Sequence, residues 1–117
     1  MAKALFVHAP DGEPSVVRMM SATSDITDQK VFCRTFELRG NYMDSCRKIL
    51  IEAQTGGDDF IFLENDLGNE IAGCLIAILL WKGAWIPILK RSAETDHYEM
   101  VIPAIQTTPL FVKEGDK

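Results

Sequence analysis

Residues 58–90 constrain the fold of this chain more than any other segment. The run Phe60–Leu63 is short and continuously apolar, as expected for a strand that is buried on both faces. An alanine- and leucine-rich stretch follows and predicts a helix over about 67–81, which Gly83 would end. Residues 85–89 form a second apolar strand candidate. A strand, a helix and a strand with short joints predict a βαβ unit, whose two strands run parallel.

A hairpin is the alternative for the second half of this segment. Lys82 and Gly83 can form a two-residue turn between strands at 75–81 and 84–89. The helix is favoured because the composition suits it and because Asn65 or Asp66 can cap its start by accepting backbone N–H bonds.

The remaining segments continue the alternation of strands and helices. Pro14 suits the first turn of a helix, and the apolar residues of 42–54 recur with helical spacing. Five strands and four helices in alternation predict one domain over residues 1–117, with an open parallel α/β sheet between two helix layers. The further predicted strands are 4–7, 31–38 and 110–112, and the further predicted helices are 14–20, 42–54 and 94–101.

Composition narrows the function classes. Hydrophobic residues make up 47% of the chain, which excludes disorder for most of it. Twelve basic against seventeen acidic residues leave a net charge of −5, which argues against nucleic acid as the main partner. The longest apolar run, 71–81, is about half of what a bilayer span needs, so no membrane segment is expected. The first residues lack the pattern of a signal peptide, and we expect a cytoplasmic protein.

The cysteines predict no metal site. Cys33, Cys46 and Cys74 are widely spaced, and no two of them form a CxxC pair. Only two histidines are present to complete a zinc site. We therefore expect free buried thiols in a reducing cytoplasm.

Function in an open parallel sheet collects where the strands end, at their carboxyl edge. Acidic groups, a hydroxyl and a lysine follow the predicted strands and would converge there. These candidates are Asp11 and Glu13 after the first strand, Glu64 after the third, Ser92 after the fourth and Lys113 after the fifth.

The segments 13–20, 60–64, 87–93 and 110–113 occur in an order that resembles the receiver domains of response regulators in two-component signal transduction. The spacing also agrees roughly, with 28 positions from Glu64 to Ser92 (92 − 64) and 21 from Ser92 to Lys113 (113 − 92). The resemblance covers most of residues 3–113.

The resemblance implies a flavodoxin-like fold with the strand order 2-1-3-4-5. It also implies that Glu64 stands at the phosphoacceptor position and that Ser92 and Lys113 stand at the switch and pocket positions. Asp11 and Glu13 would correspond to the acidic pair that binds Mg²⁺ in the family.

The departures from the family indicate that the phosphotransfer chemistry is lost. A glutamate reaches one methylene further than the family's aspartate, which spoils the in-line geometry. Asp11 and Glu13 are displaced from the strand end, and Mg²⁺ needs near-ideal octahedral ligands. The chain also stops at Lys117, so the fifth helix is missing or truncated.

These observations predict a pseudo-receiver without cofactor, metal or catalysis. In this hypothesis Glu64 replaces the charged phosphoaspartate, pairs with Lys113 and holds Ser92 inward. The domain would act in signalling by phosphorylation-independent binding of a protein partner or of a second copy. The alternative is a nucleotide-processing enzyme, because the βαβ unit also looks like TIR and nucleoside deoxyribosyltransferase domains, with Glu70 as the glutamate that acts on a ribosyl centre.

Overall fold

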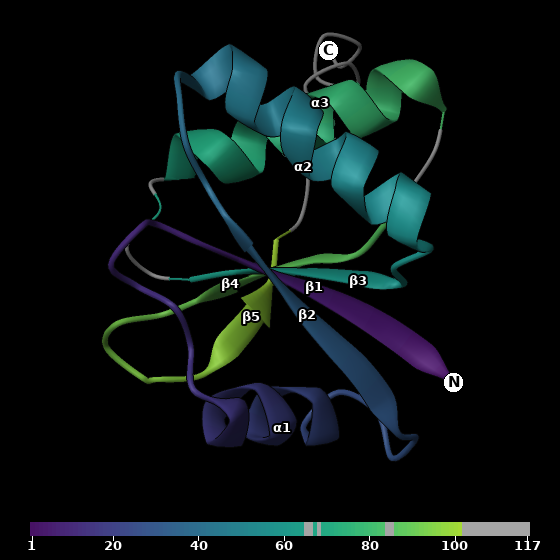
Figure 1. Ribbon diagram of the computed structural model, residues 1–117, viewed down its shortest axis with the longest axis vertical. Helices are drawn as coiled ribbons and strands as arrows, with labels where there is room; N and C mark the ends of the chain where they lie inside the picture. The colour runs from purple at the N-terminus through teal and green to yellow at the C-terminus, as the bar shows by residue number, and fades with distance from the viewer. Residues whose placement is uncertain (65–66, 68, 84–85, 102–117) are drawn as a thin grey trace, which may run out of the picture.

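The computed structural model describes residues 1–64, 67, 69–83 and 86–101. Within them a five-stranded sheet lies between two layers of helices, as Figure 1 shows. The elements in chain order are β1 (Ala2–His8), α1 (Val16–Ser24), β2 (Val31–Glu37), α2 (Tyr42–Gly56), β3 (Phe60–Leu63), α3 (Asn69–Lys82), β4 (Ile88–Arg91) and β5 (Tyr98–Met100).

The strands follow the order β2-β1-β3-β4-β5. The first four run parallel, whereas β5 is antiparallel to β4. The predicted α/β architecture, the strand order and the helices on both faces are confirmed, and the arrangement is compatible with a flavodoxin-like fold. The prediction of an entirely parallel sheet is wrong at the fifth strand.

The fifth strand lies in the segment 94–101, for which we predicted a helix. Tyr98 is half-buried against the core on the α1 face, and residues 98–100 pair antiparallel with residues 89–91 of β4, which makes them a strand. A short turn joins β5 to β4, and the Ser92 N–H donates to the His97 carbonyl oxygen at 2.9 Å. The predicted strand 110–112, and the missing fifth helix after it, fall outside the described residues.

Alternation along each strand divides the core between the two faces of the sheet. On β1, Leu5 and Val7 face α2 and α3, while Ala4 and Phe6 face α1. In Figure 1, α1 covers one face alone and the other two helices cover the opposite face. Strand β3 lies inside the sheet between the two layers, which explains its continuous apolar run.

Capping residues set the ends of the helices. Helix α1 begins after Ser15, whose side chain accepts from the Arg18 N–H, so Pro14 precedes the helix and is not in its first turn as predicted. Helix α2 is capped by Asn41. Helix α3 reaches Lys82 before Gly83 takes a positive φ of 70°, which excludes the alternative hairpin. None of the helices within the described residues has the length and apolar character needed to cross a bilayer.

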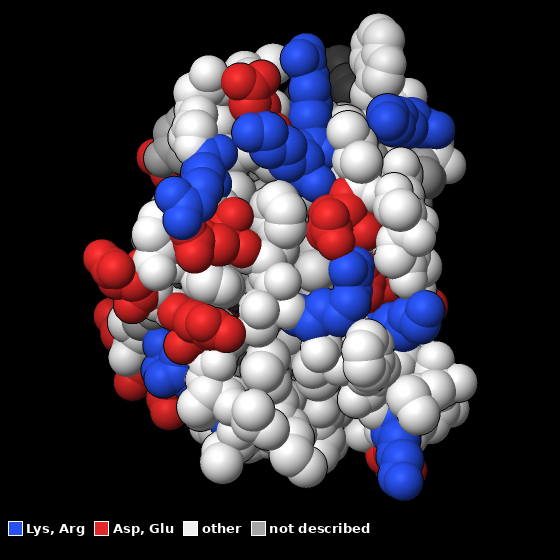
Figure 2. All heavy atoms as spheres, viewed as in Figure 1, with Lys and Arg blue, Asp and Glu red and all other residues white. Residues whose placement is uncertain are grey.

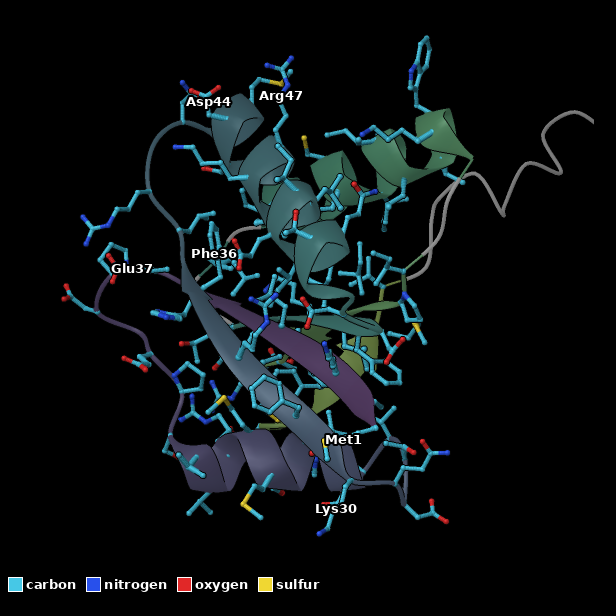
Figure 3. The ribbon with its side chains drawn as sticks, turned by 45° about the vertical axis from the view of Figure 1, so that its right-hand side comes forward. Met1, Lys30, Phe36, Glu37, Asp44 and Arg47 are labelled. Carbon is cyan, nitrogen blue, oxygen red and sulfur yellow. The ribbon has the colours of Figure 1, made fainter. Side chains whose placement is uncertain are left out.

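Strand β2 lies at one edge of the sheet and is tied to α2 by Arg34. The guanidinium donates to the Glu52 carboxylate at 2.7 Å and to Asp58 at 2.5 Å. The Asp58 side chain is fully buried, so Arg34 provides the opposite charge that it needs. In Figure 3, Lys30 and Glu37 lie at opposite ends of this strand.

Candidate functional site

The candidate site lies at the carboxyl edge of the sheet, on the face covered by α1. Glu64 follows β3 directly and continues its alternation, so it shares a face with Phe62. It is only 1% exposed. Its backbone is also fixed, because its N–H donates to Val7 and its carbonyl accepts from Leu67, both at 3.1 Å. A carboxylate at this depth requires partners.

Both oxygens of the Glu64 carboxylate have a partner. Oε1 accepts from Arg18 Nη1 at 3.0 Å and forms an ion pair with it. Oε2 accepts from the hydroxyl group of Tyr98. Arg18 comes from α1 and Tyr98 from β5, so the carboxylate connects the helix above this face with the last described strand. The charge of Glu64 is thereby compensated inside the fold.

Tyr98 is held in place by an aromatic cluster. Its ring stands edge-on to Phe62 and Phe6, with centroids 5.2 Å and 6.1 Å apart. The two phenylalanines are stacked with centroids 4.4 Å apart. Burial, and then the hydrogen bond to the Glu64 carboxylate, raise the pKa of Tyr98 above its ordinary value, and Arg18 and Arg91 oppose this weakly. Tyr98 is therefore a neutral hydrogen-bond donor at physiological pH.

Two further polar groups belong to this edge. Arg91 is paired in register with Tyr98 and forms an ion pair with Asp96 in the turn that follows. His8 ends β1 and is 3% exposed, and its Nδ1 lies 2.7 Å from the Ala9 carbonyl oxygen. Since a carbonyl only accepts, Nδ1 carries the proton. These groups extend the polar edge on both sides of Glu64.

Three of the other predicted site residues, Ser92, Asp11 and Glu13, make no described contact with this cluster. Ser92 begins the β4–β5 turn, where its carbonyl oxygen accepts from the Asp96 N–H at 2.8 Å. Asp11 and Glu13 are exposed in the loop after β1 and have no ion pair within the described part of the chain. Lys113 lies outside the described residues, so its predicted pairing with Glu64 stays a prediction.

Sequence reasoning missed both side chains that bind Glu64. Arg18 lies 46 positions before Glu64, and Tyr98 lies 34 positions after it. No local spacing signals such contacts. The alternation of residues 98–100 would have placed Tyr98 on a strand and is the one available signal.

A groove of about 820 Å³ lies on the same side of the molecule, between α1 and the start of β2. Its lining is mostly apolar and includes Met1, Met19 and Met20. Val16 and Val17 on α1 are 65% and 77% exposed. Figure 2 shows that the region over α1 carries few charged side chains, whereas charges gather over the rest of this face.

The geometry of the Glu64 cluster favours a structural role for the carboxylate over a reactive one. Its negative charge is shared between a guanidinium and a hydroxyl donor, which lowers its strength as a nucleophile. Glu70, the glutamate of the alternative enzymatic hypothesis, is exposed in the first turn of α3. Comparison with protein-family models, with curated proteins and with solved structures found no match in any of the three.

Proposed function

We propose that this chain is a phosphorylation-independent regulatory domain of the pseudo-receiver type, which acts by binding protein. The observation that carries the proposal is the buried Glu64 carboxylate, with Arg18 on one oxygen and Tyr98 on the other. The permanent charge of Glu64 at the end of β3 replaces the charge that reversible phosphorylation of an aspartate would otherwise add and remove at this position. In this proposal the site holds the fold in one signalling state and performs no transfer chemistry.

The partner that we propose is a second copy of this chain, bound through the edge of β2. This strand has seven residues and no proline, and an open edge of that kind is a template for pairing. A two-fold axis perpendicular to the sheet would make the two β2 strands antiparallel, with backbone hydrogen bonds between them. It would also bring the exposed valines of both α1 helices to one side of the joined sheet.

The loss of phosphotransfer is tested with small phosphodonors. Purified protein is incubated with acetyl phosphate and Mg²⁺, and its intact mass is measured alongside the Glu64→Asp variant. We expect no phosphoryl adduct on the wild-type chain. A stable adduct on Glu64 would overturn the proposal. An adduct on the aspartate variant alone would show that the extra methylene is the blocking feature.

The partner is tested separately by sedimentation equilibrium over a wide concentration range. We expect a reversible dimer that Val17→Asp weakens. Trp81→Asp is the matched control, because Trp81 is 89% exposed on α3, which packs beside β4 and away from β2. A wild-type chain that stays monomeric throughout would contradict self-association and leave the Glu64 argument standing.

A further inference from the structure

Two of the three cysteines meet in the core between α2 and α3. Cys46 is a fully buried residue of α2. Cys74 is a partly buried residue of α3 and packs against the same core cluster. Cys33 lies on β2 and packs on the opposite face of the sheet, beneath α1. The chain therefore contains one pair of neighbouring thiols and one thiol apart from them.

The position of Ile71 locates the two sulfur atoms. The Cys46 Sγ lies 4.0 Å from the Ile71 carbonyl oxygen. Ile71 stands one helical turn before Cys74, and side chains of a helix lean back over the preceding turn. The Cys74 side chain therefore leans toward the turn of α3 that contains Ile71, and the Cys46 sulfur contacts this same turn. Burial first, and the neighbouring Cys74 second, raise the pKa of Cys46 to about 12.

We propose that Cys46 and Cys74 form a modification site that low-molecular-weight disulfides, such as oxidised glutathione, convert to an intrachain disulfide joining α2 and α3. Cys74 is the more accessible thiol and attacks first, which forms a mixed disulfide and releases one glutathione thiolate. Cys46 then attacks the Cys74 sulfur and displaces the second glutathione. The two protein thiols lose two electrons, the glutathione disulfide gains them, and the two thiol protons end on the two glutathione molecules.

Burial of Cys46 governs the rate of the second step. Only the thiolate attacks, and a thiol whose pKa is raised to about 12 is almost entirely protonated at neutral pH. We therefore expect the mixed disulfide to form before the intrachain disulfide and the second step to accelerate as the pH rises.

Trypsin cleaves after arginine and lysine and so releases the three cysteines in three separate peptides, 31–34, 40–47 and 49–82. The full chain is incubated with oxidised glutathione, remaining thiols are alkylated, and the digest is analysed by mass spectrometry without reduction. We expect a linked peptide of 40–47 with 49–82 and an alkylated 31–34. Cys33→Ser is the matched control and should give the same linked peptide.

The variants Cys46→Ser and Cys74→Ala should each abolish the linked peptide, and Cys46→Ser should retain glutathione on Cys74. Circular dichroism establishes that each variant is folded, and Cys74→Ala alone suffices if the core position does not tolerate serine. A chain that keeps its three thiols while a reference dithiol is oxidised would overturn the proposal. A linkage that includes Cys33, or that joins two chains, would overturn it equally.

Discussion

Replacement of Tyr98 by phenylalanine isolates the hydrogen bond that holds the last described strand. The ring and its packing on Phe62 are kept, and only the hydroxyl that donates to Glu64 is lost. Hydrogen bonds to charged groups contribute about 1.5–3 kcal/mol, and we expect the upper half of this range because Glu64 is 1% exposed and water replaces the donor poorly. For a domain of this size that loss lowers the melting temperature by roughly 10 °C.

A double-mutant cycle with Glu64→Gln tests whether the charge matters. Urea denaturation gives the free energy of unfolding of the wild type, both single variants and the double variant. In the glutamine background the hydroxyl donates to a neutral acceptor, so Tyr98→Phe should cost only about 0.5–1.5 kcal/mol. The reasoning is refuted if the hydroxyl contributes equally in both backgrounds, or if its removal from the wild type costs less than about 0.5 kcal/mol.

Two further predictions follow from the described contacts. The pKa of Tyr98 is raised in the folded state, so its contribution to stability is complete below the ordinary tyrosine pKa of 10.0 and is lost as the pH rises above that value. The urea concentration at the midpoint of unfolding should therefore fall above pH 10, and it should fall less in the Tyr98→Phe variant. Gly56→Ala should destabilise the chain although alanine favours helix, because the new Cβ would lie 2.7 Å from Arg34 Cζ. In an Arg34→Ala background the destabilisation should vanish or reverse, and thermal denaturation of the variants measures both effects.

The parallel part of the fold was predictable because its signals are local. Residues 60–63 were expected as a strand and 42–54 as a helix, and the structure places β3 over Phe60–Leu63 and α2 over Tyr42–Gly56. Gly57 and Gly83 end their helices with positive φ, in the way that glycine at these positions allows. Continuous apolar runs and capping residues are read directly from short windows of sequence.

The reversal of the last described strand and the ligands of Glu64 were not predictable in the same way. Asp96 adopts a positive φ of 61° in the turn before β5, and nothing in a single sequence announces that an aspartate will do so. The position of Glu64 at a strand end was predicted from its preceding run. Its partners were not, because they depend on where α1 and β5 come to rest on the sheet.

The hydrogen bond from Tyr98 reaches past the neighbouring strand. Tyr98 lies on β5, which pairs with β4, yet its hydroxyl binds a residue at the end of β3. Fraying of this last described strand therefore also admits water to a carboxylate that is only 1% exposed. Amide hydrogen exchange along residues 98–100 would consequently report how often this strand opens, and the slowest-exchanging of these amides sets a lower limit on how often Glu64 becomes hydrated.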